Sequence, residues 1–94
     1  MNIQLGTDGN NNGNTSDIMR AMFAMAGLFK DARRDASLFS AYSVLEAATI
    51  NGAKGAQMAD QIGSLEPGKK ADFVLHDRNR PEWVPLFLTT IAFR

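Results

Sequence analysis

The carboxylate of Asp8 is the side chain in this sequence that is best placed to do chemistry. It follows a short apolar segment containing Ile3 and Leu5, and it stands in a turn between Gly6 and Gly9. At the C-terminal end of a barrel strand, an Asp so placed points into a site rather than into a core. A second interpretation is that the carboxylate only bonds its own backbone, in an Asx-turn.

The loop that begins at Asp8 also matches the opening of a calcium-binding loop. The residues that fit the D-x-N-x-N-G pattern are Asp8, Asn10, Asn12 and Gly13, with Ser16 at the ninth position. The twelfth position of such a loop requires a bidentate Glu, and here it is Met19. The residues before Asp8 also predict a strand, whereas a calcium loop follows a helix. We therefore expect no useful calcium binding by this loop.

Few other side chains in the sequence could bind a transition metal. His76 is its one histidine, and it has no cysteine. A histidine near the end of a predicted strand is typical of a surface or partly packed position. Zinc takes three or four protein ligands, so one carboxylate cannot hold it. We therefore expect this chain alone to bind no metal tightly and to be catalytically inert.

Two segments far downstream of Asp8 indicate a family. Residues 48–53 read Ala-Thr-Ile-Asn-Gly-Ala, and residues 62–72 read Ile-Gly-Ser-Leu-Glu-Pro-Gly-Lys-Lys-Ala-Asp. With Leu-Gly-Thr-Asp-Gly at residues 5–9, in this order, they resemble the C-terminal end of metal-dependent amidohydrolases. The resemblance is to the branch of cytosine and adenosine-type deaminases and triazine chlorohydrolases, and it covers residues 2–85. Residues 87–94 depart from that family, as either a truncation or a shifted reading frame would explain.

The resemblance implies an α/β fold, namely a fragment of a (β/α)8 TIM-type barrel plus part of an outer β-sandwich. Residues 1–60 would be the C-terminal end of the barrel domain, with the last strand and the helices that follow. Residues 61–94 would be a partial, truncated C-terminal β-structure. One strand cannot close a barrel, which needs eight, so this arrangement is poorly self-sufficient.

The resemblance also implies a role for Asp8 and a function for the parent enzyme. In the family, the Asp after the last barrel strand contacts a catalytic zinc or iron ion. It takes a proton from the metal-bound water and passes it to the leaving group. The parent would be a hydrolytic deaminase of nitrogen heterocycles, releasing ammonia, or chloride in triazine-acting relatives. The loop residues that could line a substrate pocket are Asn10, Asn11, Asn12 and Asn14, but no substrate-binding residue is assigned.

Periodicity and capping residues predict the elements that would position Asp8. We expect a strand over residues 2–7 and a helix over residues 17–30, capped by Thr15 or Ser16, before a polar connector over residues 30–35. The apolar stripe of that helix comprises Ile18, Met22, Met25 and Phe29, and we place the methionines Met19, Met22 and Met25 in the core. Ser40 should cap a helix over residues 41–48. A break at residues 49–51 precedes a short helix over residues 52–58. We interpret residues 49–53 as a structural elbow rather than as part of a catalytic site.

Beyond that helix, Pro67 and Gly68 predict a tight turn. Residues 71–76 predict a strand, with Phe73 and Leu75 on one face. A last strand is expected over residues 86–93.

Composition excludes several function classes. Ten basic and ten acidic residues cancel, so nothing favours nucleic acid or an anionic membrane as partner. The absence of cysteine and of a signal-peptide pattern at the start fits a cytoplasmic protein. The helix over residues 17–30 has more apolar side chains than this chain can cover, so we expect self-association. An alternative function is therefore a small, non-catalytic protein-interaction module.

Overall fold

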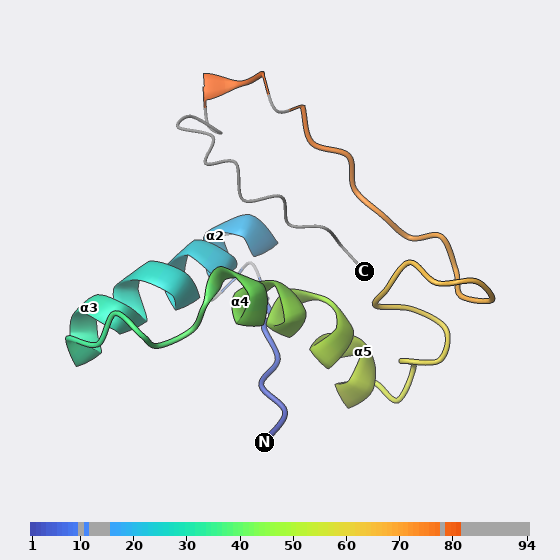
Figure 1. The fold of residues 1–94 in the computed structure, drawn as a ribbon, viewed down its shortest axis with the longest axis horizontal. Helices are drawn as coiled ribbons and strands as arrows, with labels where there is room; N and C mark the ends of the chain where they lie inside the picture. The colour runs from blue at the N-terminus through green and yellow to red at the C-terminus, as the bar shows by residue number, and fades with distance from the viewer. Residues whose placement is uncertain (10, 12–15, 78, 82–94) are drawn as a thin grey trace.

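A computed structural model describes residues 1–9, 11, 16–77 and 79–81, and its described elements are helical (Figure 1). The first is a continuous rod made of the α-helix α2 (Ile18–Phe23), the π-helix η1 (Ala24–Leu28) and the α-helix α3 (Phe29–Arg33). The second is a pair of short helices, α4 (Ala41–Ala48) and α5 (Ile50–Gly55), separated by Thr49. No helix within the described part of the chain is long and apolar enough to cross a membrane.

The rod occupies the predicted position, but both of its ends differ from the prediction. Asp17 is the N-cap residue, and its Oδ1 accepts the N–H of Met19 at 2.9 Å and that of Arg20 at 3.4 Å. The predicted caps Thr15 and Ser16 are therefore wrong. The rod continues to Arg33, through most of the segment predicted to be a connector. Basic residues in the last turn stabilise a helix against its dipole, which explains the extension.

The second pair of helices agrees more closely with the sequence. Helix α4 has its predicted bounds, and the Ser40 hydroxyl accepts the N–H of Ser43 at 3.1 Å. The predicted break falls at Thr49 alone, so α5 begins and ends earlier than expected. Ala53 is buried, and a Cβ on Gly63 would lie 2.7 Å from its methyl group. The close approach shows that Gly63 and Ala53 leave no room for larger side chains, and the structural elbow at residues 49–53 stays an interpretation.

The core lies where η1 crosses α4. Its buried members are Met25, Val44 and Ala47, and the residues packed around them are Leu5, Met22, Ala26 and Phe39. The prediction of a methionine core is correct for Met25 and Met22 but wrong for Met19, which is 41% exposed. Phe23 and Leu28 also leave large apolar side chains on the surface.

The two predicted strands that lie among the described residues are not formed. Residues 2–7 and 71–76 have no strand assignment, although neither segment is helical. A strand needs a neighbour to receive its backbone hydrogen bonds, and the described part of the chain supplies none. The α/β class is therefore not seen among the described residues. The Pro67–Gly68 turn is confirmed, with Gly68 at φ +91°. The last predicted strand, residues 86–93, lies outside the described residues.

Candidate functional site

Asp8 lies at the end of an extended segment that contacts the α4–α5 pair. The N–H of Leu5 donates to the carbonyl of Ala47 at 2.9 Å, and Nδ2 of Asn2 donates to the carbonyl of Asn51 at 3.0 Å. The sequence did not predict these two hydrogen bonds. Both acceptors are backbone carbonyls, which every residue has, so no residue type indicates them. Asp8 is exposed.

The backbone at Asp8 has an unusual conformation. Asp8 has φ +58°, a left-handed conformation that Asp tolerates better than most residues. Its Oδ1 accepts the N–H of Gly9 at 2.7 Å. The carboxylate therefore bonds the backbone one residue on, whereas an Asx-turn bonds the backbone two residues on. That bond uses one carboxylate oxygen, so the other remains able to bind a metal or a proton.

The described residues do not fit a complete metal site. Among them, no group of three His, Cys, Asp or Glu side chains lies close enough together to hold an ion. His76 is exposed, which agrees with the expected surface or partly packed position. Asp8 can contribute one oxygen ligand, and zinc takes three or four protein ligands. A metal at Asp8 would need its other donors from outside the described residues.

The calcium-loop pattern lies largely outside the described residues. Asn10, Asn12 and Gly13 are not described, and Asn14 is not described either. Asn11, Ser16 and Met19 are exposed. Weak or absent calcium binding therefore stays a prediction, as does any role of the asparagines in a substrate pocket.

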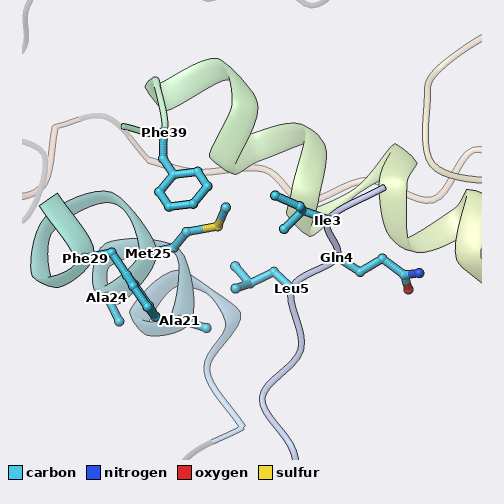
Figure 2. A pocket seen from close by; sticks show the side chains of 8 residues that line it. All are labelled: Ile3, Gln4, Leu5, Ala21, Ala24, Met25, Phe29 and Phe39. Atoms are coloured by element: carbon cyan, nitrogen blue, oxygen red, sulfur yellow. The ribbon is translucent and has the colours of Figure 1, made fainter. Parts of the chain in front are cut away.

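An apolar pocket of about 350 Å³ lies beside the segment that leads to Asp8. Its lining residues are Ile3, Gln4, Leu5, Ala21, Ala24, Met25, Phe29 and Phe39. Figure 2 shows Ile3 and Leu5 directed towards Met25, while Gln4 is directed away. The rings of Phe29 and Phe39 meet edge to face, with centroids 6.4 Å apart. The pocket offers apolar contact but little polar chemistry.

Two carboxyl groups with a lowered pKa belong to turns rather than to this site. A hydrogen bond from the Ser37 side chain, with one from its backbone, lowers the pKa of Asp35. A hydrogen bond from Ser64 and the nearby Lys69 ammonium lower the pKa of Glu66. Each carboxyl group accepts a hydrogen bond from a serine two residues away in the sequence, which is typical of a side chain that stabilises a turn.

Comparisons with known proteins agree with the resemblance read from the sequence. The model of the amidohydrolase family matches residues 1–93. A 5-methylthioadenosine/S-adenosylhomocysteine deaminase from Teredinibacter turnerae is 42% identical over 86 residues, which are 92% of this chain and 20% of the deaminase. An S-triazine hydrolase from Gordonia rubripertincta is 37% identical over 94 residues, which are 98% of this chain and 20% of the hydrolase.

A solved structure has the same local fold. It is an adenosine deaminase from Xanthomonas campestris with bound zinc, 38% identical, and the superposition has a TM-score of 0.85. The match covers 92% of this chain and 20% of that deaminase. The chain thus spans about a fifth of the length of the relatives that it matches.

Proposed function

Because the chain belongs to the amidohydrolase family, a TIM-barrel superfamily, we propose that it is the C-terminal part of a longer metal-dependent hydrolase. The observation that carries this proposal is the family match over residues 1–93 together with the one-fifth coverage of full-length relatives. The reaction we propose is hydrolysis of a C–N bond in a nitrogen heterocycle. The names of the relatives, two deaminases and a triazine hydrolase, support this class of substrate.

In the parent enzyme, residues 1–60 would form the end of the barrel, and residues 61–94 would form part of an outer β-structure. Two features support this division. Residues 2–7 are extended, and within the described part of the chain they have no strand to pair with. Phe73, Val74 and Leu75 are exposed in a second extended segment, as expected of a strand without its sheet.

Asp8 is the residue to which we assign a catalytic and metal-contacting role. Its carboxylate has one oxygen that the local turn does not use, and a carboxylate can accept a proton and release it to a leaving group. The zinc in the Xanthomonas deaminase supports a divalent metal, zinc or iron, in the parent. Such a metal, when bound, would make its water a nucleophile near neutral pH. Among the described residues, no three possible ligands lie together, so we expect none bound to this chain alone.

The proposal is tested by a chimera of the Teredinibacter deaminase in which this chain replaces the matching 86 residues. We expect the chimera to deaminate its substrate, and Asp8→Asn to lower kcat by about 10² to 10⁴, the usual contribution of a positioned proton-transfer group. Asp77→Asn, also at an exposed carboxylate, is the matched control and should leave kcat unchanged. A folded, metal-loaded chimera without activity, or full activity in Asp8→Asn, would refute the proposal.

The isolated chain should show no hydrolase activity and no tight zinc site. Calorimetric titration of the purified chain with Zn²⁺ checks this. A 1:1 site tighter than micromolar that disappears in Asp8→Ala would show that the chain completes a metal site by itself.

We propose that the partners are a heterocyclic substrate in the parent and a second copy of this chain in isolation, with neither nucleic acid nor membrane among them. Phe23, 72% exposed, and Leu28, 60% exposed, support association, because burying each such side chain contributes roughly 1.5 to 3 kcal/mol. Light scattering should detect oligomers. A cytoplasmic location belongs to the same proposal.

The alternative, a small protein-interaction module, is favoured by the same exposed side chains. The two functions differ in whether these 94 residues form a complete core. A dispersed amide spectrum from a monomer that binds no hydrophobic dye would favour the module. An associated or loosely packed chain that binds the dye would favour the part of a larger enzyme.

A further inference from the structure

The break between α4 and α5 frees a backbone carbonyl that an unbroken helix would use internally. In a continuous α-helix, the carbonyl of Ala47 would accept the N–H of Asn51, four residues on. Helix α4 instead ends before Thr49, which has φ −130° and ψ −98°. The Thr49 hydroxyl donates to the carbonyl of Leu45 at 2.7 Å. That carbonyl is satisfied without another helical turn, and the carbonyl of Ala47 is left for a different donor.

The donor that bonds the carbonyl of Ala47 lies in the segment that leads to Asp8. The N–H of Leu5 donates to the freed carbonyl of Ala47 at 2.9 Å. Three residues earlier, the side chain of Asn2 donates to the carbonyl of Asn51 at 3.0 Å. Because the two acceptors lie on opposite sides of the break, the two bonds together fix the direction and the register of residues 2–5.

A third contact supports the same register. The side-chain amide of Gln4 occupies the space where a Cβ on Gly55 would stand. Gln4 thus turns towards α5, while its neighbours Ile3 and Leu5 turn towards Met25 (Figure 2). This alternation is that of an extended segment, in which a slip of one residue would reverse every side chain.

We propose that the break at Thr49 is a positioning device for Asp8, and that Thr49 and Asn2 are positioning residues. Two residues separate the anchored Leu5 from Asp8, so the anchor determines where the carboxylate stands. Register matters to a reaction because one residue of extended chain spans about 3.3 Å, while a misplacement of about 1 Å can cost a hundredfold in rate. The inference rests on the proposed role of Asp8, although the anchor itself can be measured without activity.

A distance measurement on the full 94-residue chain tests the device. The chain has no cysteine, so spin labels on Gly6→Cys and Lys54→Cys report the separation of the segment from α5. A Cβ on Gly6 meets nothing within 4 Å, and Lys54 is exposed. Dilution with unlabelled chain removes distances between copies. We expect a narrow distribution in the otherwise unchanged chain, one at least twice as wide in Thr49→Ala, and a narrow one again in Thr49→Ser, which restores the hydroxyl.

Hydrogen exchange at the amide of Leu5 gives the second measurement. Exchange should be at least tenfold faster in Thr49→Ala and in Asn2→Ala, and unchanged in the control Asn79→Ala, at an exposed asparagine far along the chain. A narrow distribution and a protected Leu5 amide in Thr49→Ala would overturn the proposal, as would a wide distribution before any change at Thr49. If the chimera is inactive while the Leu5 and Asn2 hydrogen bonds are intact, the proposed function is refuted, but the positioning role of the Thr49 break is not.

Discussion

Two valines show how differently two regions of this chain are packed. Val44 in α4 is 2% exposed, whereas Val74 in the segment after the Pro67–Gly68 turn is 76% exposed. Val44 belongs to the core cluster with Met25 and Ala47. Val74 lies between two other exposed apolar residues. Since the side chains are identical, the difference comes from what each backbone can do with the rest of the chain.

The comparison teaches that the helices of this chain form from local interactions, whereas its extended segments need a neighbouring strand in order to pack. A helix satisfies its own backbone hydrogen bonds and needs other elements only to cover one face. An extended segment satisfies them only beside another strand. Residues 2–5 are a middle case, because the carbonyl of Ala47 beside the helix break and that of Asn51 in α5 accept hydrogen bonds from them. Residues 71–77 have no strand assignment and are exposed.

The largest effect on the free energy of unfolding is expected at Gly63, where close packing leaves no space for a side chain. Gly63 has φ +93°, and a Cβ there would lie 2.7 Å from the Ala53 methyl group. Gly63→Ala should therefore combine backbone strain with overpacking and lower the free energy of unfolding by about 3 kcal/mol. Gly68→Ala is the matched control, because Gly68 has φ +91° but open space around its Cβ. It should cost about 1 kcal/mol from strain alone. Equal losses in urea unfolding would contradict the role of close packing.

The valine pair tests the comparison directly. Val44→Ala removes two methyl groups from the core and should lower the free energy of unfolding by about 2 kcal/mol. Val74→Ala makes the same change on the surface and should stay within about 0.5 kcal/mol. Thermal or urea unfolding of both variants measures the difference. A comparable loss in Val74→Ala would mean that residues 71–77 are packed in solution.

The helices could be predicted from the sequence because their signals are local. The Ser40 cap and the apolar residues that follow it determined α4 to its exact bounds. The rod was also predicted, but its cap was misplaced, since Ser16 and Asp17 are both good cap residues and only the backbone decides between them. Its extension to Arg33 was missed because charged residues fit a connector and a last helical turn equally well.

The strands and the site could be predicted only in part because they depend on residues elsewhere. The pattern at residues 2–7 and 71–76 predicted two strands, and neither is formed, because pairing needs a neighbouring strand. Asp8 was found through its glycine-flanked turn and the two downstream segments. Its anchors at Ala47 and Asn51 are backbone carbonyls, which every residue has, so no residue type marked them. The single sign was the Thr49 break.

A smaller effect is expected at the start of α4. The Ser40 hydroxyl accepts the N–H of Ser43 at 3.1 Å, one of the bonds that the first helical turn cannot make internally. Ser40→Ala should lower the free energy of unfolding by about 1 kcal/mol. Ser40→Asp keeps an acceptor and should retain most of the stability. A loss in Ser40→Asp as large as that in Ser40→Ala would show that the hydroxyl acts in another way.

The smallest effect is expected in the turn over residues 64–69, which precedes the exposed residues 71–77. The Ser64 hydroxyl donates to Glu66, and the Lys69 ammonium lies 3.2 Å from the same oxygen, so the pKa of Glu66 is lowered from its ordinary value of 4.5. A lowered carboxyl pKa means that these bonds stabilise the turn above pH 4.5 and that this contribution is lost as the pH falls through the folded-state pKa.

Ser64→Ala should raise the pKa of Glu66 in a carboxyl NMR titration and leave that of Asp35 unchanged. Ser37→Ala should do the reverse, because Ser37 donates to Asp35 in the same way. If Ser64→Ala left the titration of Glu66 unmoved, the turn would not be formed in solution, and the contrast between packed helices and unsupported chain would begin before Glu66 rather than after the Pro67–Gly68 turn.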